Sequence, residues 1–546
     1  MKNKSGYIYL IVLIIPVSLI IISNLFTEVR TPYYLLGNYD PSYVYLLNSL
    51  NIAQFTSPGY IEHPGTPLHV IGAVVMKIYF TFAGKSGDLV TDVFERPETY
   101  LRAINFTMIL LNAFALFMLG IVTYKLYQSI PMAVFLQLTP VYSIVIFQRL
   151  STVTAENLLI FLIIIFIIIS LKFINENTLS QKIIFAYTAG FAIITGAGIA
   201  TKIIFFPFLI IPLLLLKKIS NKVLYIIFTF ISFIFFVLPA ISYYKFFTRW
   251  IKSLFIHDKM YGKGDRSVID WTYFTANVKS IFINEKYFAI VYLIIIAGLV
   301  GLFIYSKKNR INGTNIFEKI KPEIKLLTGI FLLITVQIII VAKHYAIHYM
   351  LPAFMLLVLA IFLVIIITNK LFPEKFKIIK LNTLFIILTM SIIIIKIPNM
   401  MYMYSGLKIE RTESIKVTEF INDKYPDKPV ISGMYIWNKE AALNFAMPWT
   451  GYQSGKYKKT IDGLKPNHLF YDNENEKIYC ASDTSKNFIK EVFSKNNRLI
   501  LVSNKYTPVE KIMKEIKEVY NYGNSEYINV YKNGEGAEIY EIKLKE

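Results

Sequence analysis

Long apolar segments separated by short polar ones occupy the chain up to about residue 400. Apolar runs such as Leu159–Leu171 have no polar face. The hydrocarbon core of a bilayer is about 30 Å thick and is crossed by about 20 apolar residues in a helix. The pattern predicts an all-α polytopic membrane protein with eleven spans: 7–25, 101–124, 129–147, 154–173, 182–200, 203–216, 222–242, 287–306, 324–342, 346–368 and 379–399. Because 203–216 is short, we expect it to be broken or tilted.

A twelfth segment, 67–84, is ambiguous, and the loop charges decide it. It carries Lys77 in its middle and begins at Thr66-Pro67, a typical helix start. If it lies along the membrane, only three basic residues of the short loops face outward: Arg149, Lys202 and Lys343. The opposite side then carries eighteen: Lys2, Lys4, Lys125, Lys172, Lys182, Lys217, Lys218, Lys222, Lys307, Lys308, Arg310, Lys319, Lys321, Lys325, Lys370, Lys375, Lys377 and Lys380. The positive-inside rule therefore predicts a multi-pass plasma-membrane protein with a cytoplasmic N-terminus and an extracytoplasmic C-terminus.

Three longer parts then lie outside the membrane. They are the loop 26–100, with helices in the membrane plane, the loop 243–286, and the tail 404–546. The tail is predicted to be a small α/β domain, which leaves 1–403 as the transmembrane module. Its expected strands are 429–435, 497–503, 526–532 and 537–543, and its expected helices are 408–424, 485–495 and 508–520.

Composition removes several classes of protein. Hydrophobic residues make up 55% of the chain and charged residues 17%, and the mean hydropathy is +0.50. These values exclude disorder and a soluble enzyme. The single cysteine, Cys480, excludes an internal disulfide and a cysteine zinc cluster. The net charge of +21 is explained by loop topology, so we expect no nucleic-acid partner.

Two polar clusters lie in the first outer loop. Asp40-Pro41 predicts the start of a helix that ends near Asn51, where Asp40 is either an N-cap or a carboxylate directed at a bound hydroxyl. Glu62 and His63 open a turn that Pro64, Gly65 and Pro67 stiffen. This turn either lays the following helix on the bilayer or places His63 or Glu62 beside a substrate.

Two further clusters lie at outer helix ends. Glu156 is in a first helical turn, where the dipole favours a carboxylate, and Arg149 is close by. Lys202 and Lys343 either snorkel to the interface or bind a ligand. His344 and His348 have the i, i+4 spacing of zinc ligands, but no third ligand accompanies them, so we expect no metal. These lysines and histidines suit a phosphate, which needs hydrogen-bond donors.

The order of these motifs resembles the glycosyltransferases of the GT-C fold that use polyprenyl-phosphate sugars, such as protein O-mannosyltransferases and aminoarabinose transferases. The resemblance covers roughly residues 5–370. In chain order, the motifs that carry it are Asp40, His63-Pro64-Gly65-Thr66-Pro67, Arg102, Glu156, Gly198–Lys202 and Tyr349-Met350-Leu351-Pro352. The chain departs from the pattern at Pro41, where members often have Glu.

The resemblance implies an inverting transfer of a sugar from a polyprenyl-phosphate donor to a hydroxyl of a glycan, lipid or protein acceptor. Asp40 is expected as the general base, with Glu156 as the second catalytic acid. Donor-phosphate binding is expected from Lys202, Lys343, His344 and His348. Substrate binding is expected from Glu62, His63, Arg102, Arg149 and Tyr349. No cofactor is expected, although some members of this fold bind a divalent cation.

Other functions are less well supported by the pattern. A flippase or transporter of lipid-linked sugars usually has charges at the membrane midplane and inverted repeats, whereas here the charges lie at helix ends and no repeat is visible. A membrane scaffold for the tail would not need these charges on one side. In the tail, Tyr435, Trp437, Trp449 and Tyr452 are interpreted as core aromatics or as surfaces for sugar stacking.

Overall fold

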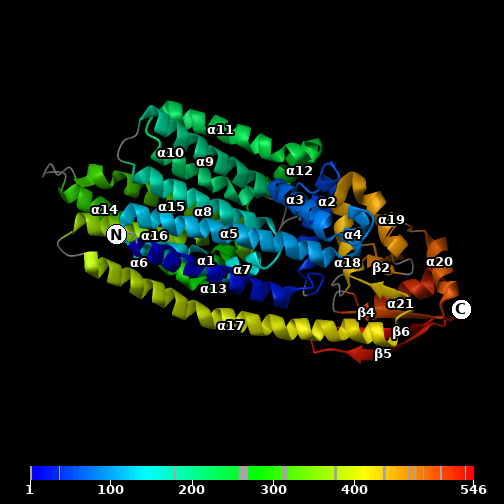
Figure 1. The fold of residues 1–546 in the computed structure, drawn as a ribbon. Coiled ribbons are helices and arrows are strands. Elements are labelled where there is room, and N and C mark those ends of the chain that lie inside the picture. Colours follow the sequence, from blue (N-terminus) through cyan, green and yellow to red (C-terminus); the bar gives the residue numbers. More distant parts are fainter. Residues whose placement is uncertain are drawn as a thin grey trace.

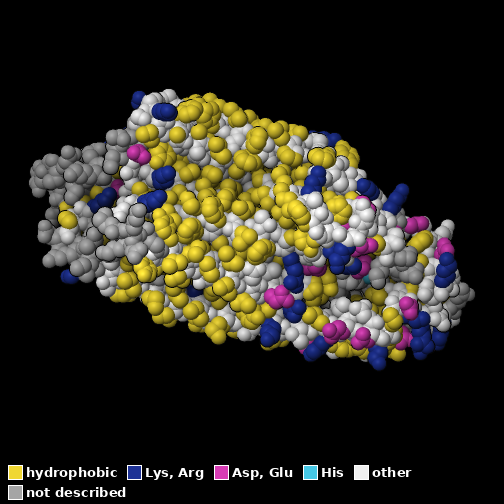
Figure 2. Space-filling view, viewed as in Figure 1, with side chains coloured by type: hydrophobic (Ala, Val, Ile, Leu, Met, Phe, Trp, Pro, Cys, Tyr) yellow, Lys and Arg dark blue, Asp and Glu magenta, His cyan; other side chains and the backbone are white. Residues whose placement is uncertain are grey.

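The computed structural model shows a long helical bundle that carries a small α/β domain at one end (Figure 1). It describes residues 3–545 except 36, 177–179, 257–267, 310–315, 374–377, 434–437, 465–467, 473–474, 482, 484, 505–506 and 535. We call the end of the bundle beside the α/β domain the domain end. Apolar side chains cover the visible face of the bundle, and charged side chains gather beside the α/β domain (Figure 2).

The helices follow the predicted apolar segments closely. Those of the bundle are α1 (Asn3–Arg30), α2 (Tyr39–Ala53), α3 (Thr66–Ala83), α4 (Leu89–Glu95), α5 (Pro97–Tyr127), α6 (Ile130–Gln137), α7 (Ile144–Leu150), α8 (Ala155–Ile174), α9 (Gln181–Thr201), α10 (Ile210–Leu215), α11 (Ile219–Val237), α12 (Tyr244–Phe255), α13 (Trp271–Asn284), α14 (Lys286–Asn309), α15 (Ile316–Lys343), α16 (Leu351–Leu371) and α17 (Ile378–Lys424). Short 3₁₀ helices are η1 (Thr139–Val141), η2 (Ile203–Leu209), η3 (Leu238–Tyr243) and η5 (Ile347–Met350).

Two of the predicted spans cross the bundle as broken helices. Pro140 lies in η1, between α6 and α7, and Pro207 lies in η2, before α10. A proline lacks a backbone donor and interrupts an α-helix. The interrupted segment 130–150 still joins both ends, because Ser129 bonds Asn382 at the start of α17, whereas the Tyr33 hydroxyl donates to the Ser151 carbonyl at the domain end.

The helix α3 does not carry the chain to the other end of the bundle. By length and composition it is one of ten described helices that could span a membrane. However, Arg102 near the start of α5 donates to Glu28 near the end of α1 at 3.0 Å, and the Tyr33 amide donates to Glu98 at 2.6 Å. The segment between α1 and α5 therefore leaves and re-enters the bundle at the domain end. Setting α3 aside and including the two broken crossings gives eleven crossings in the described residues, as the loop charges predicted.

The surface of α3 fits a helix lying along a bilayer. Leu68, Gly72 and Met76 are buried, whereas Ile78 and Phe82 are 56% and 86% exposed. The apolar exposed face has no protein cover, which is expected when lipid contacts it.

The last span and the first predicted helix of the tail are one element. The helix α17 runs without interruption for 47 residues, through Pro398. The boundary expected at residue 404 therefore lies inside this helix. Its C-terminal part leaves the bundle and packs on the sheet, where Val417 contacts Ile500 and Val502.

The tail folds as a sheet between helices. The strands are β1 (Val430–Ser432), β2 (Leu469–Asp472), β3 (Lys477–Tyr479), β4 (Arg498–Ser503), β5 (Glu526–Lys532) and β6 (Glu538–Lys543), in the order β3-β2-β1-β4-β6-β5. The helices are α18 (Lys439–Ala446), α19 (Ser454–Leu464), α20 (Lys486–Lys495) and α21 (Val509–Glu518), with a 3₁₀ helix η6 (Met447–Gln453). Leu499 and Leu501 face the core with α20 and α21, and Ile500 faces α17, because side chains alternate along a strand.

Strands β2 and β3 and the α18–η6–α19 segment were absent from the prediction. β2 and β3 are only four and three residues long, too short for a clear alternation. The α18–η6–α19 segment lies between the sheet and α2. Asn444 of α18 donates to the Tyr479 hydroxyl of β3 at 2.8 Å. On the other side, the Tyr457 hydroxyl donates to Asn51 at 2.7 Å and accepts from Gln54 at 2.8 Å. This contact brings the tail to the N-terminal loop.

Candidate functional site

A polar cavity of about 360 Å³ lies at the domain end. Its walls come from α2, the loop after it, α7, α8, the end of α9, η5, α18 and η6. The lining residues are Asp40, Pro41, Val44, Tyr45, Tyr60, Glu62, His63, Arg149, Glu156, Lys202, His348, Tyr349, Phe445 and Trp449. Eight of the eleven residues expected at the site thus line one cavity.

Asp40 presents its carboxylate to the cavity. It is in the first turn of α2 with φ −97° and ψ 119°, which are not helical values. The residue at the N-cap position is Asn38, and within the described residues Asp40 makes no capping hydrogen bond. The side chain is exposed to the hollow, while the dense surroundings raise the pKa of Asp40 by desolvation, against a smaller lowering by Arg149. The Asp40 carboxylate is therefore not used to cap the helix.

Glu156, Lys202 and His348 form a buried charged cluster. Lys202 Nζ donates to Glu156 Oε1 at 2.6 Å, and His348 Nε2 is 3.7 Å from the same oxygen. Glu156 is fixed by the first turn of α8, and Lys202 follows the last residue of α9, with its amide bonded to the Gly198 carbonyl at 2.8 Å. Lys202 Nζ also lies 4.9 Å from the ring centroid of Tyr349. Three helix ends far apart in the sequence thus meet here.

The His63 turn is fixed against the end of α9. The Gly65 amide donates to the Thr201 carbonyl at 3.0 Å. Gly65 has φ +68°, and a Cβ there would lie 2.8 Å from the Tyr45 ring, so only glycine fits. His63 Nε2 is 3.4 Å from the Tyr349 hydroxyl. Burial, and secondarily the charge of Lys202, lower the pKa of His63 to about 3, so His63 is neutral at physiological pH.

Arg149 lies between the acids of the cavity. Its charge acts on both Asp40 and Glu156. Arg30, which the sequence analysis did not single out, lies close enough to Arg149 to interact with it electrostatically. Arg30 Nη1 donates to Asn38 Oδ1 at 2.8 Å, two residues before Asp40. Arg30 falls in the predicted loop 26–100, five residues after the first predicted span, and no motif in the sequence singled it out.

The cavity also has an aromatic wall. Tyr60 lies edge-on to Tyr45 and to Trp449, with ring centroids 5.8 and 5.7 Å apart. Phe445 and Trp449 come from α18 and η6, so the tail contributes directly to the cavity. Trp449 was considered for sugar stacking in the sequence, and it is 36% exposed here. Tyr452 contacts Tyr243 outside the lining, and Tyr435 and Trp437 lie outside the described residues.

Three residues expected at the site do not line the cavity. Arg102 bonds Glu28 and Thr31 on the outside of the bundle, because its position near the start of α5 places it against the end of α1. Lys343 ends α15, and His344 Nε2 is 3.3 Å from the Leu254 carbonyl of α12. The chain turns between His344 and η5, so His348 enters the cavity and His344 does not.

The cavity combines an exposed carboxylate with cations and ring surfaces. Chemically, a carboxylate such as that of Asp40 can accept a proton, the cations Lys202 and Arg149 can bind an anion, and the aromatic wall can pack against an apolar face of a ligand. Among the described residues, no group of three or more His, Cys, Asp or Glu side chains has an arrangement that could hold a metal ion.

Comparisons with known proteins include a similarity to a solved structure. No protein-family model matches the chain, and no curated protein matches it. The crystal structure of ArnT from Cupriavidus metallidurans, bound to undecaprenyl phosphate, is similar over 98% of both chains, with a TM-score of 0.46 and 10% sequence identity.

Proposed function

We propose that the protein is a membrane glycosyltransferase that moves a sugar from a polyprenyl-phosphate donor to an acceptor hydroxyl, with inversion, on the extracytoplasmic side. The observation that carries the proposal is the cavity in which the Asp40 carboxylate and the Lys202 and Arg149 cations lie together beneath an aromatic wall. The order of motifs along the chain supports the same reaction class.

Asp40 is the general base of the proposed reaction. The acceptor oxygen attacks the anomeric carbon, its proton passes to the Asp40 carboxylate, and the bond between the anomeric carbon and the phosphate oxygen breaks. The raised pKa of Asp40 makes its carboxylate a better proton acceptor than a fully solvated one. An acid exposed to the cavity, not used in capping, is free of competing bonds for this step within the described residues.

Lys202 and Arg149 stabilise the departing lipid phosphate. An ammonium has three donors, and Glu156 uses one of those of Lys202, which leaves two for phosphate oxygens. Arg149 adds a planar guanidinium suited to phosphate. Glu156 then orients Lys202, and His348 adds a ring nitrogen at the same place. Lys343 and His344 lie outside the cavity and have no direct contact with the phosphate in this proposal.

The lipid tail and the membrane orientation follow from the bundle. In the proposed reaction the donor lipid enters from the apolar surface of the bundle, one face of which Figure 2 shows, and the transfer takes place at the domain end. The excess of basic residues at the opposite end supports a cytoplasmic position for that end in the proposed orientation. The bond to the lipid phosphate supplies the free energy, so the proposed reaction needs no nucleotide.

The test is transfer by the purified full chain from a radiolabelled polyprenyl-phosphate sugar. Asp40→Asn keeps the size of the side chain and should lower turnover by about 10²–10⁴-fold, the usual contribution of a general base. Asp88→Asn is the matched control, because Asp88 caps α4 outside the cavity and asparagine caps equally well. Wild-type turnover in Asp40→Asn would remove Asp40 from the role of base. Donor transport across vesicles without cleavage would replace the transferase by a flippase.

A further inference from the structure

A second cavity, of about 170 Å³, lies on the membrane-facing side of the bundle. It is formed by α1, α6–α7 and α17, and it shares no lining residue with the polar cavity. Its lining residues are Ile15, Ser18, Leu19, Ile22, Leu138, Val141, Phe147, Ile393, Lys396, Ile397 and Met400. All but Ser18 and Lys396 are apolar.

Lys396 is a buried cation inside a predicted membrane span. Its side chain is 6% exposed, whereas Ile397 beside it is 47% exposed on the surface of the bundle. The ammonium contacts the rings of Tyr142 and Tyr287, at 5.2 and 4.8 Å from their centroids. Two ring faces stabilise a cation only partly, and a membrane-buried lysine usually marks a functional site.

The nearest acid does not form a direct ion pair with Lys396. Glu285 is close enough to interact electrostatically, but in the described part of the chain Lys396 has no carboxylate within 4.0 Å. The Glu285 carboxylate instead accepts a hydrogen bond from Ser143 at 3.1 Å. The protein therefore leaves donors of Lys396 for a ligand in the cavity.

The position of the cavity indicates the class of ligand. Most of its lining comes from α1 and α17, and one of these residues, Ile397, is exposed on the apolar surface of the bundle. Glu285 directly precedes α14 at the domain end, which places Lys396 near one membrane surface. A ligand at this position has to be anionic at the lysine and apolar elsewhere.

We propose that this cavity binds an anionic glycerophospholipid, with Lys396 contacting the headgroup phosphate and the walls of α1 and α17 holding part of an acyl chain. The lipid neutralises the buried ammonium. It also fixes α17, the helix that connects the bundle to the α/β domain. This binding site is independent of the transferase proposed above.

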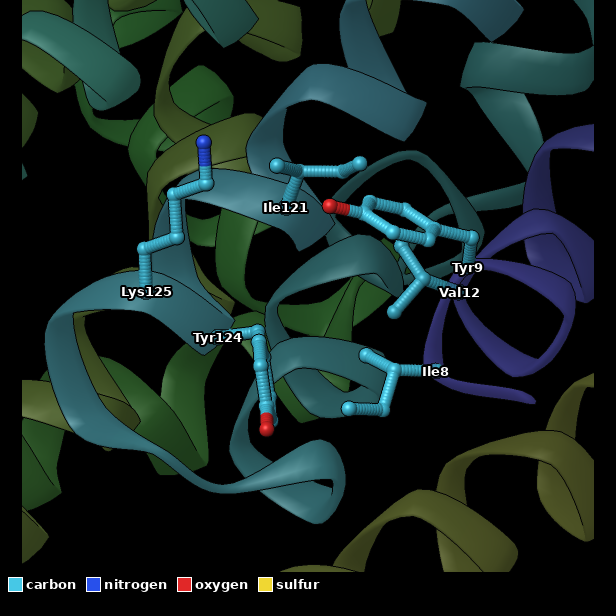
Figure 3. A pocket seen from close by; sticks show the side chains of 6 residues that line it. All are labelled: Ile8, Tyr9, Val12, Ile121, Tyr124 and Lys125. Atoms are coloured by element: carbon cyan, nitrogen blue, oxygen red, sulfur yellow. The ribbon is translucent and has the colours of Figure 1, made fainter. Parts of the chain in front are cut away.

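Lys125 provides a matched control. It also lines a small apolar cavity, between α1 and α5 at the opposite end of the bundle. Figure 3 shows its side chain extending away from Ile8 and Val12. Because Lys125 is exposed, its charge is solvated and needs no bound lipid.

The experiment is native mass spectrometry of the full chain from nanodiscs that contain phosphatidylglycerol and phosphatidylcholine. Wild type and Lys125→Met should retain phosphatidylglycerol, and Lys396→Met should lose it by about fivefold or more, the effect of one lysine near an anionic surface. Lys396→Arg should keep it. Ser18→Trp keeps the lysine but fills the cavity, so it should lose the lipid too, and it replaces Lys396→Met if that variant fails to fold.

Three results would overturn the proposal. Equal retention of phosphatidylglycerol by wild type and both cavity variants would show that Glu285 and the two tyrosines are sufficient to stabilise the charge of Lys396 without a bound lipid. Equal retention of phosphatidylcholine would show that the headgroup charge is not recognised. Displacement by undecaprenyl phosphate, with no retention of phosphatidylglycerol, would assign the cavity to a lipid carrier instead.

Discussion

Glu156 and Lys202 are each nearly inaccessible to solvent, so neither charge is stabilised by water. Their separation of 2.6 Å gives a strong ion pair, but only while both partners are present. Removing one partner leaves the other buried and uncompensated, which usually costs more than the pair itself contributes. The ion pair is therefore needed to maintain the shape of the cavity as well as its chemistry.

Replacing one member of this pair should destabilise the protein more than replacing both. Lys202→Met should lower the free energy of unfolding by about 3–5 kcal/mol. Glu156→Gln with Lys202→Met should cost clearly less than the sum of the two single changes. Thermal unfolding of the four proteins in one detergent forms the double-mutant cycle. Additive effects would mean that the two charges do not interact.

His63 should make stability depend on pH in a defined range. Its pKa is about 3 in the folded chain and 6.5 as a free side chain, so the unfolded chain binds more protons between these values. The free energy of unfolding therefore falls as the pH is lowered from about 6.5, by up to about 1.4 kcal/mol per pH unit.

The matching measurement is the melting temperature of wild type and His63→Gln between pH 4 and 7. The variant should show a weaker loss of stability on acidification, because glutamine does not titrate, and all other groups contribute equally to both curves. Parallel curves would show that His63 is protonated in the folded protein.

At the scale of elements, the sequence predicted the crossings and, from its short length, that 203–216 would be broken or tilted, but it did not predict the break at Pro140. The apolar pattern of 129–147 is unaffected by Pro140, so hydropathy alone cannot locate the break. The same limit applies to the candidate site, because hydropathy shows where helices end but not how the chain turns there. Asp40, Glu156 and Lys202 each lie at a helix end that the sequence identifies, and their meeting was inferred from topology. The position of Lys343 outside the cavity depends on the turn between the end of α15 and the start of η5 at Ile347, which no sequence pattern indicates.

The α18–η6–α19 segment escaped prediction because its partner is distant. Tyr457 is buried against Asn51 and Gln54, about 400 residues earlier, and a single sequence gives no sign of such a pair. This segment carries Phe445 and Trp449 to the cavity, so the aromatic wall depends on a contact between the tail and α2.

Tyr457→Phe should loosen this segment without unfolding the sheet. The change leaves the buried amide of Asn51 and the half-buried amide of Gln54, at the end of α2, with fewer partners, at a cost of about 1–3 kcal/mol. Hydrogen exchange should increase in 439–464 and stay unchanged in β4 and β6. Lys459→Ala, at an exposed position of α19, is the control. Faster exchange throughout the α/β domain would instead show that the segment and the sheet unfold together.

At the scale of the whole molecule, the number of crossings determines which parts of the chain lie at each end of the bundle. Eleven crossings place the N-terminus at one end of the bundle and the α/β domain at the other, with the polar cavity between that domain and the membrane-facing helices. The lysines at the opposite end lie in the last turn of a crossing, as Lys172 and Lys370 do, or just after its end, as Lys217 does. An odd number of crossings and this charge asymmetry are two independent constraints, and they agree.

The charge asymmetry predicts which side of the membrane carries the cavity. In a Cys480→Ser background, Lys459→Cys in α19 should react with a membrane-impermeant maleimide on intact cells. Ser220→Cys, in the first turn of α11, should react only after permeabilisation. Both positions are exposed, so access of the reagent depends on membrane side alone. The reverse labelling pattern would put the polar cavity on the cytoplasmic side. The basic loops would then all lie outside, against the positive-inside rule. The protein would also have to bind the donor before the donor crosses the membrane.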